Sequence, residues 1–371
     1  MVGGSAGFLN NRTDFDTPIT LMNQVKHTVH AYEGCLYGIV SRGTESLFGT
    51  VGNELLGGQS VPVIKLWKSD RRPLAAFCSF RGHTSFVHSL QFLPSAPLLA
   101  SCSDKLCVYD INKQQMLTQC AAEGTAFSCM TSSAVSITAK GVDGSAAWQQ
   151  LYCATKANEV VCYDVRQKFY DVRVSARFPF AVHSAVKTAA EIPLICAIAT
   201  FSNEMFAIAW NCGIIEVFQQ RVATPLFQWQ AHYCHVVKLT FLGKTKLLSA
   251  GVDGSVSVWN LGEAKPTLFA KLTGLSTIGS AYGLSVTDYG SGPGLMYANG
   301  DSVYTCNDLD VREYMNAADA TPQVLMMNPT VLCDGITAKP LSNLRLCANV
   351  ACPLRRIALC GSENGNLYVV Q

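Results

Sequence analysis

The chain has 371 residues, of which 49% are hydrophobic and only 15% are charged. A charged fraction this far below the roughly 25% usual for soluble domains favours a large, well-buried core over disorder. The formal net charge of +2 is too small to supply the electrostatic field that nucleic-acid binding needs, so we expect no nucleic-acid partner.

The N-terminal stretch contains no membrane-targeting pattern. Residues 1–16 read "MVGGSAGFLNNRTDFD", without a basic run before an apolar segment of signal-peptide length. We expect them to form a flexible segment of a cytoplasmic chain, or of a part excised from a longer one. The most apolar segment, Ile192 to Trp210, is divided by Pro193, Asn203 and Glu204 into two pieces of strand length, so we expect no membrane span.

Strand patterns dominate the rest of the chain. Runs of four to seven residues rich in Val, Ile, Leu, Tyr and Thr alternate with turns of Gly, Asn, Asp and Ser, which predicts an all-β fold. One unit, a strand, a polar turn and a strand with an aromatic or apolar end, recurs at intervals of roughly 40 to 65 residues. The strand ends are Trp67, Tyr109, Tyr163, Phe218, Trp259, Cys306 and Val370.

Seven units of this length predict a seven-bladed β-propeller that occupies residues 17–371. The last unit ends with the chain after its third strand, one strand short of a complete blade. Residues 17–24, "TPITLMNQ", precede the first unit and are predicted to supply the missing strand, which would close the ring without an open sheet edge.

The second and fifth units show the repeat most clearly. In the second, Gly82-His83 precedes the first strand and Tyr109-Asp110 ends the third; in the fifth, Ala231-His232 and Trp259-Asn260 take these places. This arrangement resembles the WD-repeat family, which implies the seven-bladed propeller fold.

The fifth unit also contains a His, a Ser and an Asp that have two interpretations. His232, Ser249 and Asp253 are the residue types of a hydrolytic triad. The resemblance to WD repeats implies instead a buried hydrogen-bonded chain that runs from Trp259 through Ser249 and His232 to Asp253. We favour this structural role, because buried polar groups require partners and such a network holds a loop to the strands. In the second unit, His83 and Tyr109 form a weaker copy.

No other pattern predicts chemistry. The sixteen cysteines are scattered through apolar runs without Cys-x-x-Cys spacing, which indicates buried thiols rather than a disulfide framework or a zinc site. Clustered carboxylates are absent from the sequence. We therefore expect no metal, no cofactor and no enzyme activity.

Two short motifs suggest alternative partners. Tyr163, Asp164 and Arg166 in "CYDVRQK" resemble the box by which some WD-repeat substrate receptors dock on cullin-type ubiquitin ligases, although that box prefers Trp where this chain has Tyr163. Arg355-Arg356 is similar to the Arg-Arg-Gly motif of phosphoinositide-binding propellers, but Ile357 replaces the glycine. Both motifs are also compatible with ordinary structural roles.

A narrower resemblance rests on three passages: "FRGHTSFVHSLQFL", "QAHYCHVVKL…LLSAGVDGSVSVWNL" and the final "RRIALCGSENGNLYVV". Their order is similar to the C-terminal propeller of BEACH-domain proteins. This resemblance implies a non-catalytic scaffold for protein partners in endosomal and lysosomal traffic or autophagy. It also implies a BEACH domain in the same parent chain, and peripheral association with vesicle membranes through partners.

Overall fold

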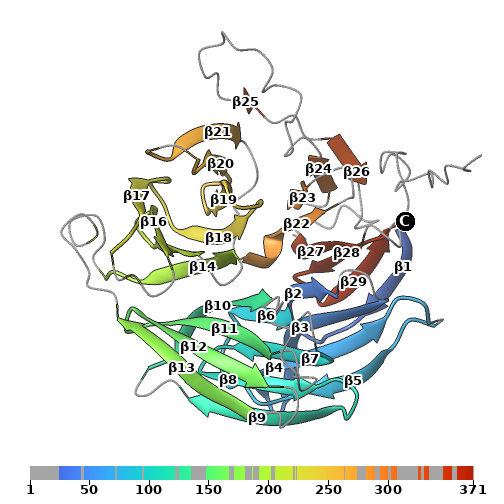
Figure 1. Ribbon diagram of the computed structural model, residues 1–371. Coiled ribbons are helices and arrows are strands. Elements are labelled where there is room, and N and C mark those ends of the chain that lie inside the picture. The colour runs from blue at the N-terminus through green and yellow to red at the C-terminus, as the bar shows by residue number, and fades with distance from the viewer. Residues whose placement is uncertain are drawn as a thin grey trace, which may run out of the picture.

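The computed structural model describes residues 25–42, 46–71, 73–93, 96–121, 125–134, 148–166, 171–179, 186, 192–201, 205–219, 222, 224–262, 264–273, 281–288, 293–299, 302–306, 325–326, 330–333, 346–352 and 357–370. These residues form seven sheets, antiparallel except for one short pair, and the sheets are the blades of a β-propeller (Figure 1). The predicted all-β, seven-bladed fold is confirmed. Among the described residues, no helix is long and apolar enough to cross a membrane.

Each blade contains four strands that follow one another from the centre of the ring outward. The innermost strands are β2 (Leu36–Ser41), β6 (Ser89–Phe92), β10 (Phe127–Ala134), β14 (Ile195–Phe201), β18 (Val236–Phe241), β22 (Leu284–Asp288) and β27 (Leu346–Cys352). The second strands are β3 (Leu47–Leu56), β7 (Leu98–Cys102), β11 (Trp148–Thr155), β15 (Met205–Trp210), β19 (Lys246–Gly251), β23 (Pro293–Asn299) and β28 (Ile357–Ser362).

The third strands are β4 (Gln59–Lys68), β8 (Lys105–Asp110), β12 (Glu159–Arg166), β16 (Ile214–Gln219), β20 (Val256–Asn260), β24 (Ser302–Cys306) and β29 (Asn366–Val370). All seven predicted strand ends lie at or near the ends of these strands. The outermost strands are β5 (Ala76–Phe80), β9 (Gln115–Ala121), β13 (Asp171–Pro179), β17 (Phe227–Gln230), β21 (Thr267–Leu272), β26 (Thr330–Cys333) and β1 (Val25–His30).

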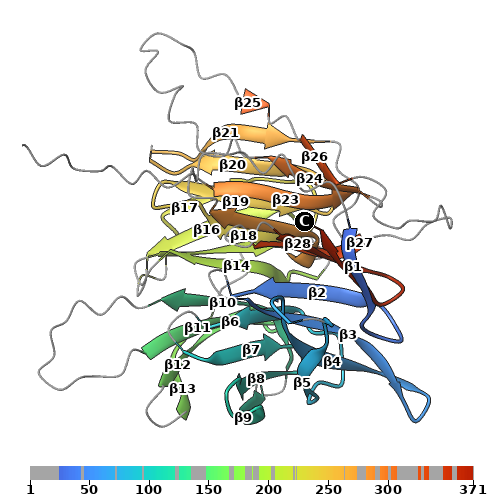
Figure 2. The same cartoon turned by 90° about the vertical axis from the view of Figure 1, so that its right-hand side faces the viewer.

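The outer edges of the fifth and sixth blades are irregular. Blade six reaches its outermost strand only at Thr330, although β24 ends at Cys306. Between them, β25 (Leu325–Met326) pairs in parallel with β21 and adds a fifth strand to blade five. Figure 2 shows β25 beyond β21, on the outer side of that blade. A 3-10 turn, η1 (Ala281–Gly283), precedes β22.

The last blade contains both the first and the last described strands of the chain. The strand β1 pairs antiparallel with β29, from Val25 opposite Val370 to His30 opposite Asn366. Closure by an N-terminal strand was predicted, but the residues differ: Val25–His30 occupy the edge of β29, and the predicted stretch 17–24 lies outside the described residues. The sequence "VKHTVH" has few apolar residues because an outermost strand is solvated on one side.

The core is divided into clusters between neighbouring blades rather than gathered in one mass. One cluster joins blades seven, one and two; others join blades two and three, three and four, four and five, and five and six. Middle strands are buried on both faces, which explains uninterrupted apolar runs such as "LLASC" in β7 and "MFAIAW" in β15. Each blade therefore depends on its neighbours for burial of its faces.

In several blades, a residue in the turn before the third strand is bonded to the loop that leads into the next blade. Asn158, Gly213, Gly254 and Gly365 occupy the same place in the hairpin before the third strand, and all have positive φ. The carbonyl of Gly213 accepts hydrogen bonds from the N–H groups of Ala231 and His232, and that of Gly365 accepts from Ala31 and Tyr32. In blade three, Asn158 uses its side-chain oxygen to accept from the N–H of Ile195. These bonds join consecutive blades.

Candidate functional site

The structure brings together the four residues that the sequence singled out in blade five. The indole N–H of Trp259 donates to Ser249 Oγ at 2.9 Å, and His232 Nε2 lies 2.7 Å from the same oxygen. Asp253 does not meet His232 directly. Ser255 stands between them, with its Oγ 3.1 Å from His232 Nδ1 and 2.7 Å from Asp253 Oδ1.

The members of this network come from several parts of the blade. His232 lies in the connection from β17 to β18, Ser249 in β19 and Trp259 in β20, while Asp253 and Ser255 belong to the turn between β19 and β20. The turn is held by a second bond, from the N–H of Ser255 to Asp253 Oδ1 at 3.0 Å. The network thus fixes the entry loop of the blade to its second and third strands.

The electrostatics of the network do not favour nucleophilic catalysis. Burial lowers the pKa of His232, although Asp253 opposes this effect, so the imidazole is neutral near pH 7. Burial would raise the pKa of Asp253, but hydrogen bonds from Ser255 lower it below its ordinary value. Ser249 is fully buried and its oxygen is already shared by Trp259 and His232, so a substrate has no path to it.

Blade two contains the shorter form of the same network. His83 Nε2 lies 2.6 Å from Ser101 Oγ, and Ser101 Oγ lies 3.4 Å from the hydroxyl of Tyr109. Here His83 Nδ1 reaches the carboxylate of Asp104 directly, at 3.1 Å. No serine intervenes, because the turn between β7 and β8 is two residues shorter than the turn between β19 and β20 in blade five. Tyr109 takes the place of Trp259.

Blade one carries a third network that the sequence reasoning missed. The indole N–H of Trp67 donates to Thr50 Oγ1 at 2.8 Å, and the hydroxyl of Tyr32 lies 2.7 Å from the same oxygen. Tyr32 occupies the place of the histidine. Thr50 precedes Trp67 by 17 residues, whereas Ser249 precedes Trp259 by 10, because the β3–β4 hairpin is longer. The signal in the sequence is a tyrosine in the entry loop, followed by a hydroxyl residue and a tryptophan at the two ends of a longer hairpin.

A group of potential metal ligands overlaps the blade-five network. In the described part of the chain, side-chain atoms of His232, Cys234 and Asp253 lie within 4.8 Å of one another. The space between them exists because residue 251 is glycine: a Cβ there would lie within about 3.0 Å of an atom from each. However, His232 and Asp253 already bond Ser255, so a metal would have to displace these hydrogen bonds.

Some of the predicted partner-binding residues are buried, and the side chains of the others lie outside the described part of the structure. Tyr163 and Asp164 lie in β12 and are buried, and Asp164 Oδ1 accepts a hydrogen bond from Gln150 at 3.3 Å. Neither can therefore contact a partner directly. Arg166 is the last residue of β12, and its side chain is outside the described part of the structure. Arg355 and Arg356 also lie outside the described residues, between β27 and β28.

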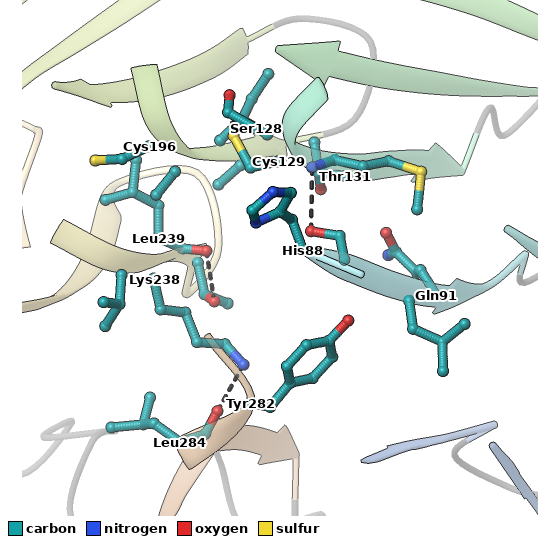
Figure 3. Close-up of a pocket in the computed structure, with 18 of the residues that line it drawn as sticks. His88, Gln91, Ser128, Cys129, Thr131, Cys196, Lys238, Leu239, Tyr282 and Leu284 are labelled. Atoms are coloured by element: carbon teal, nitrogen blue, oxygen red, sulfur yellow. Dashed lines mark hydrogen bonds between the residues drawn. The ribbon is translucent and has the colours of Figure 1, made fainter. Parts of the chain in front are cut away.

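A cavity of about 780 Å³ lies at the centre of the ring and was not anticipated from the sequence. Its walls are formed by the innermost strands of the blades and the loops that enter them. Figure 3 shows Lys238 extending along one side of the cavity to Leu284, with Tyr282 next to them and His88 further away. Volumes of this size are typical of small-molecule sites.

Comparison with known proteins supports the repeat and the fold. The family model described as "WD domain, G-beta repeat" matches residues 76–109 and 223–260. Each segment starts with the outermost strand of one blade and ends with the third strand of the next, so blades two and five carry WD repeats. No curated protein matches the sequence.

Solved structures with this shape are numerous, with 1301 matching chains. One of them is the Cps50 (Swd1) β-propeller domain of Myceliophteria thermophila, with a TM-score of 0.65. It is 12% identical, and the alignment covers 94% of this chain and 98% of the other. At this identity the likeness shows the fold alone.

Proposed function

We propose that this WD-repeat propeller is a non-catalytic scaffold that binds other proteins through the loops entering its innermost strands. We call residues 81–88, 192–194 and 231–235 the entry face. These loops lie on one side of the ring because every innermost strand starts there. The observation that carries the proposal is the apolar surface exposed on them: Tyr233 is 94% exposed, Ile192 78% and Phe86 42%.

Large apolar side chains exposed on loops of a rigid scaffold are typical of protein interfaces. The bonding within the blades also supports this role. The polar networks of blades one, two and five bond their own strands and loops, so they contribute stiffness rather than reactive groups. WD40 propellers commonly act as such platforms.

The test is a comparison of captured proteins. The 371-residue chain and a Phe86→Ser/Tyr233→Ser variant would serve as baits in the same extract, with quantitative mass spectrometry of the bound proteins. The matched control is Met116→Ser, which alters an exposed apolar residue on the outermost strand β9. The proposal predicts specific partners that the entry-face variant loses and the control keeps. Identical partner sets for all three baits would refute it.

The trafficking role is the finer part of the proposal. It rests on the order of the three passages that are similar to the C-terminal propeller of BEACH-domain proteins. The parent gene then encodes a BEACH domain upstream of Met1, and the partners are proteins of endosomal, lysosomal or autophagic membranes. Sequencing the transcript upstream of Met1 tests this directly. An in-frame stop codon immediately upstream would remove the BEACH assignment and leave the scaffold proposal unaffected.

Docking on a cullin-type ubiquitin ligase is a second candidate function. It is supported by the Asp-x-Arg pattern of Asp164 and Arg166 at the end of β12. Since Asp164 is buried, Arg166 would have to make the contact. Capture of the ligase adaptor by the wild-type chain, with loss of capture in Arg166→Ala, is the expected result. Equal capture by both would exclude this function.

Phosphoinositide binding is a third candidate and rests on Arg355 and Arg356 alone. Liposomes with and without phosphoinositide provide the measurement. Binding that depends on the lipid and falls in the Arg355→Ala/Arg356→Ala variant would support it. Binding that is unchanged in the variant would remove it.

A further inference from the structure

Three side chains of different ligand type meet beside the blade-five network. The atoms of His232, Cys234 and Asp253 that can bind a metal lie within 4.8 Å of one another. His232 and Cys234 are two residues apart in the connection from β17 to β18, and Asp253 belongs to the turn between β19 and β20. This turn is bonded to the connection, from the N–H of Val252 to the carbonyl of His235 at 2.9 Å. A nitrogen, a sulfur and a carboxylate oxygen are thereby held together.

The three groups surround the position where residue 251 has no side chain. A Cβ atom there would lie 2.7 Å from Cys234 Sγ, 2.7 Å from Asp253 Oδ1 and 3.0 Å from His232 Nδ1. Gly251 is not one of the glycines with positive φ, so its backbone conformation does not require glycine. The missing side chain instead leaves a space of atomic size that the three potential ligands border.

Blade two shows how the same position is filled where no thiol is present. Ser85 takes the place of Cys234, two residues after the histidine of the network. Ser103 takes the place of Gly251, two residues after the serine of the network. Ser103 Oγ lies 2.8 Å from Ser85 Oγ, so its side chain occupies the space that blade five leaves open. Blade five thus differs from its copy at two positions: one supplies a thiol and the other makes room for an ion.

The ligand types and their charge fit a zinc ion. Neutral imidazole nitrogen, thiolate sulfur and carboxylate oxygen are all zinc ligands, and one thiolate with one carboxylate balances a divalent cation. Calcium and magnesium prefer oxygen ligands, which disfavours them here. Zinc bonds are about 2.0–2.3 Å long, so each ligand atom would move by about 1 Å or less toward an ion at the Cβ position of Gly251.

Binding requires the exchange of one hydrogen bond. His232 Nδ1 binds the ion in place of Ser255 Oγ, which lies 3.1 Å from it. The ring proton is then on Nε2, which donates to Ser249 Oγ at 2.7 Å and orients the imidazole, as the partners of metal-bound histidines do. Asp253 Oδ1 keeps the N–H of Ser255, because a carboxylate has lone pairs for both contacts. The thiol of Cys234 releases its proton to solvent as the sulfur binds.

We propose that His232 Nδ1, Cys234 Sγ and the carboxylate of Asp253 form a zinc site at the entry face of blade five. Asp253 is exposed, so the ion enters from solvent and a water molecule completes its tetrahedral coordination. The ion ties the loop that displays Tyr233 to the β19–β20 turn. This site departs from the expectation of no metal, which rested on the lack of Cys-x-x-Cys spacing. It does not depend on the trafficking role or on any protein partner.

The first measurement is the zinc affinity of the 371-residue chain, determined by competition with a chromophoric chelator. Cys234→Ser and Gly251→Ser each introduce the residue found in blade two, which removes the thiol or fills the space and leaves the histidine in place. Each should weaken zinc binding about tenfold or more. Cys120→Ser, which removes a thiol from the outermost strand β9, is the matched control and should bind zinc as the wild type does.

Cobalt substitution identifies the sulfur ligand directly. A Co²⁺ ion bound by a thiolate has a charge-transfer absorption in the near ultraviolet, which the wild type and Cys120→Ser should show and Cys234→Ser should lack. Melting without metal establishes that each variant is folded, and the wild-type spectrum decides the question even if a substitution prevents folding. The proposal is wrong if the wild-type chain shows no thiolate–cobalt band, or if folded Cys234→Ser binds zinc as tightly as the wild type.

Discussion

Gly213 in blade four lies directly against the backbone of His232 in blade five. A Cβ atom on Gly213 would be 1.9 Å from the carbonyl oxygen of His232, a distance that no adjustment of a side chain can relieve. The carbonyl of Gly213 also accepts the N–H of His232 at 3.2 Å. The turn of one blade thus positions the histidine of the next blade's network.

Gly213→Ala should therefore destabilise the propeller by more than 3 kcal/mol, because backbone atoms of two blades must separate. The matched control is Gly243→Ala. Gly243 has φ of +88°, almost the same as +87° at Gly213, but nothing lies within 4 Å of its Cβ position. Its substitution should cost only the left-handed strain of about 1 kcal/mol. Equal unfolding free energies for the two variants in urea would contradict this account.

His232→Ala should lower the free energy of unfolding by about 1–3 kcal/mol. The substitution leaves the hydroxyls of Ser249 and Ser255 without their shared partner inside the blade. Urea titration followed by tryptophan fluorescence measures the change. Tyr233→Ala, which alters the exposed neighbour of His232, should have an effect below about 0.5 kcal/mol. A large loss in the control would show that the loop, and not the network, is responsible.

Stability should fall as the pH decreases below about 6.5. Burial lowers the pKa of His83 and of His232 in the folded chain, so the unfolded chain takes up protons first as the pH drops through 6.5. Each histidine contributes a slope of at most about 1.4 kcal/mol per pH unit. Urea unfolding at pH 7.5, 6.5 and 5.5 provides the measurement. The slope should be smaller in His232→Gln, and a flat profile in the wild type would refute the prediction.

Lys238 should make a second pH-dependent contribution, in the alkaline range. Burial lowers its pKa from 10.5 to about 8, so between these values the unfolded chain binds a proton that the folded chain does not. Relative to Lys238→Met, the wild type should lose on the order of 2 to 3 kcal/mol of stability as the pH falls from 10.5 to 8. The difference between the two chains removes the contributions of titrating cysteines and tyrosines, which they share. A constant difference would contradict the prediction.

Several other titratable side chains line the central cavity beside Lys238. The titratable side chains lining the cavity with Lys238 are His88, Cys129, Lys156, Cys196, His235 and Tyr282. Burial raises the pKa of Cys129 and of Tyr282, so both side chains remain neutral between pH 8 and 10.5.

The closing strand offers a test on two adjacent residues. Val29 packs against the cluster that joins blades seven, one and two, whereas Thr28 on the other face of β1 is exposed. Val29→Asp should cost about 2 kcal/mol or more and expose the edge of β29 to aggregation, while Thr28→Asp should leave both properties unchanged. Denaturant unfolding and light scattering measure the two effects. Equal behaviour would mean that β1 does not seal the ring.

The seven-bladed fold was predictable from the sequence because each third strand follows a polar turn and ends on an aromatic or apolar residue. This pattern is recognisable even though the loops of the seven units differ in length. The sequence also singled out Trp259, Ser249 and His232. Ser255 was missed because nothing in the spacing shows that an extra serine enters the chain of bonds. Tyr32 was missed because a phenol replaced the imidazole. The outermost strand was placed too early because a solvated strand has little apolar signal.

The central cavity could not be predicted from the sequence, for a different reason. Alternation along a strand predicts which face of a sheet is buried, but the cavity is bordered by the inner edges of strands from separate blades. Lys238 reads in the sequence as an ordinary polar position in "VVKLTF". Its enclosure follows only from the approach of β22, which begins more than forty residues later and supplies the carbonyl of Leu284.

The pairing of β1 with β29 also determines when the propeller ring can close during synthesis. His30 and Asn366, bonded at 3.0 Å, are separated by 336 residues, so a ribosome releases the first strand long before it makes its partner. At roughly 5–20 residues per second, β1 waits for tens of seconds while the intervening blades emerge. During synthesis the nascent chain is an open arc with an unsealed hydrophobic flank, and chaperone protection should matter most in that interval.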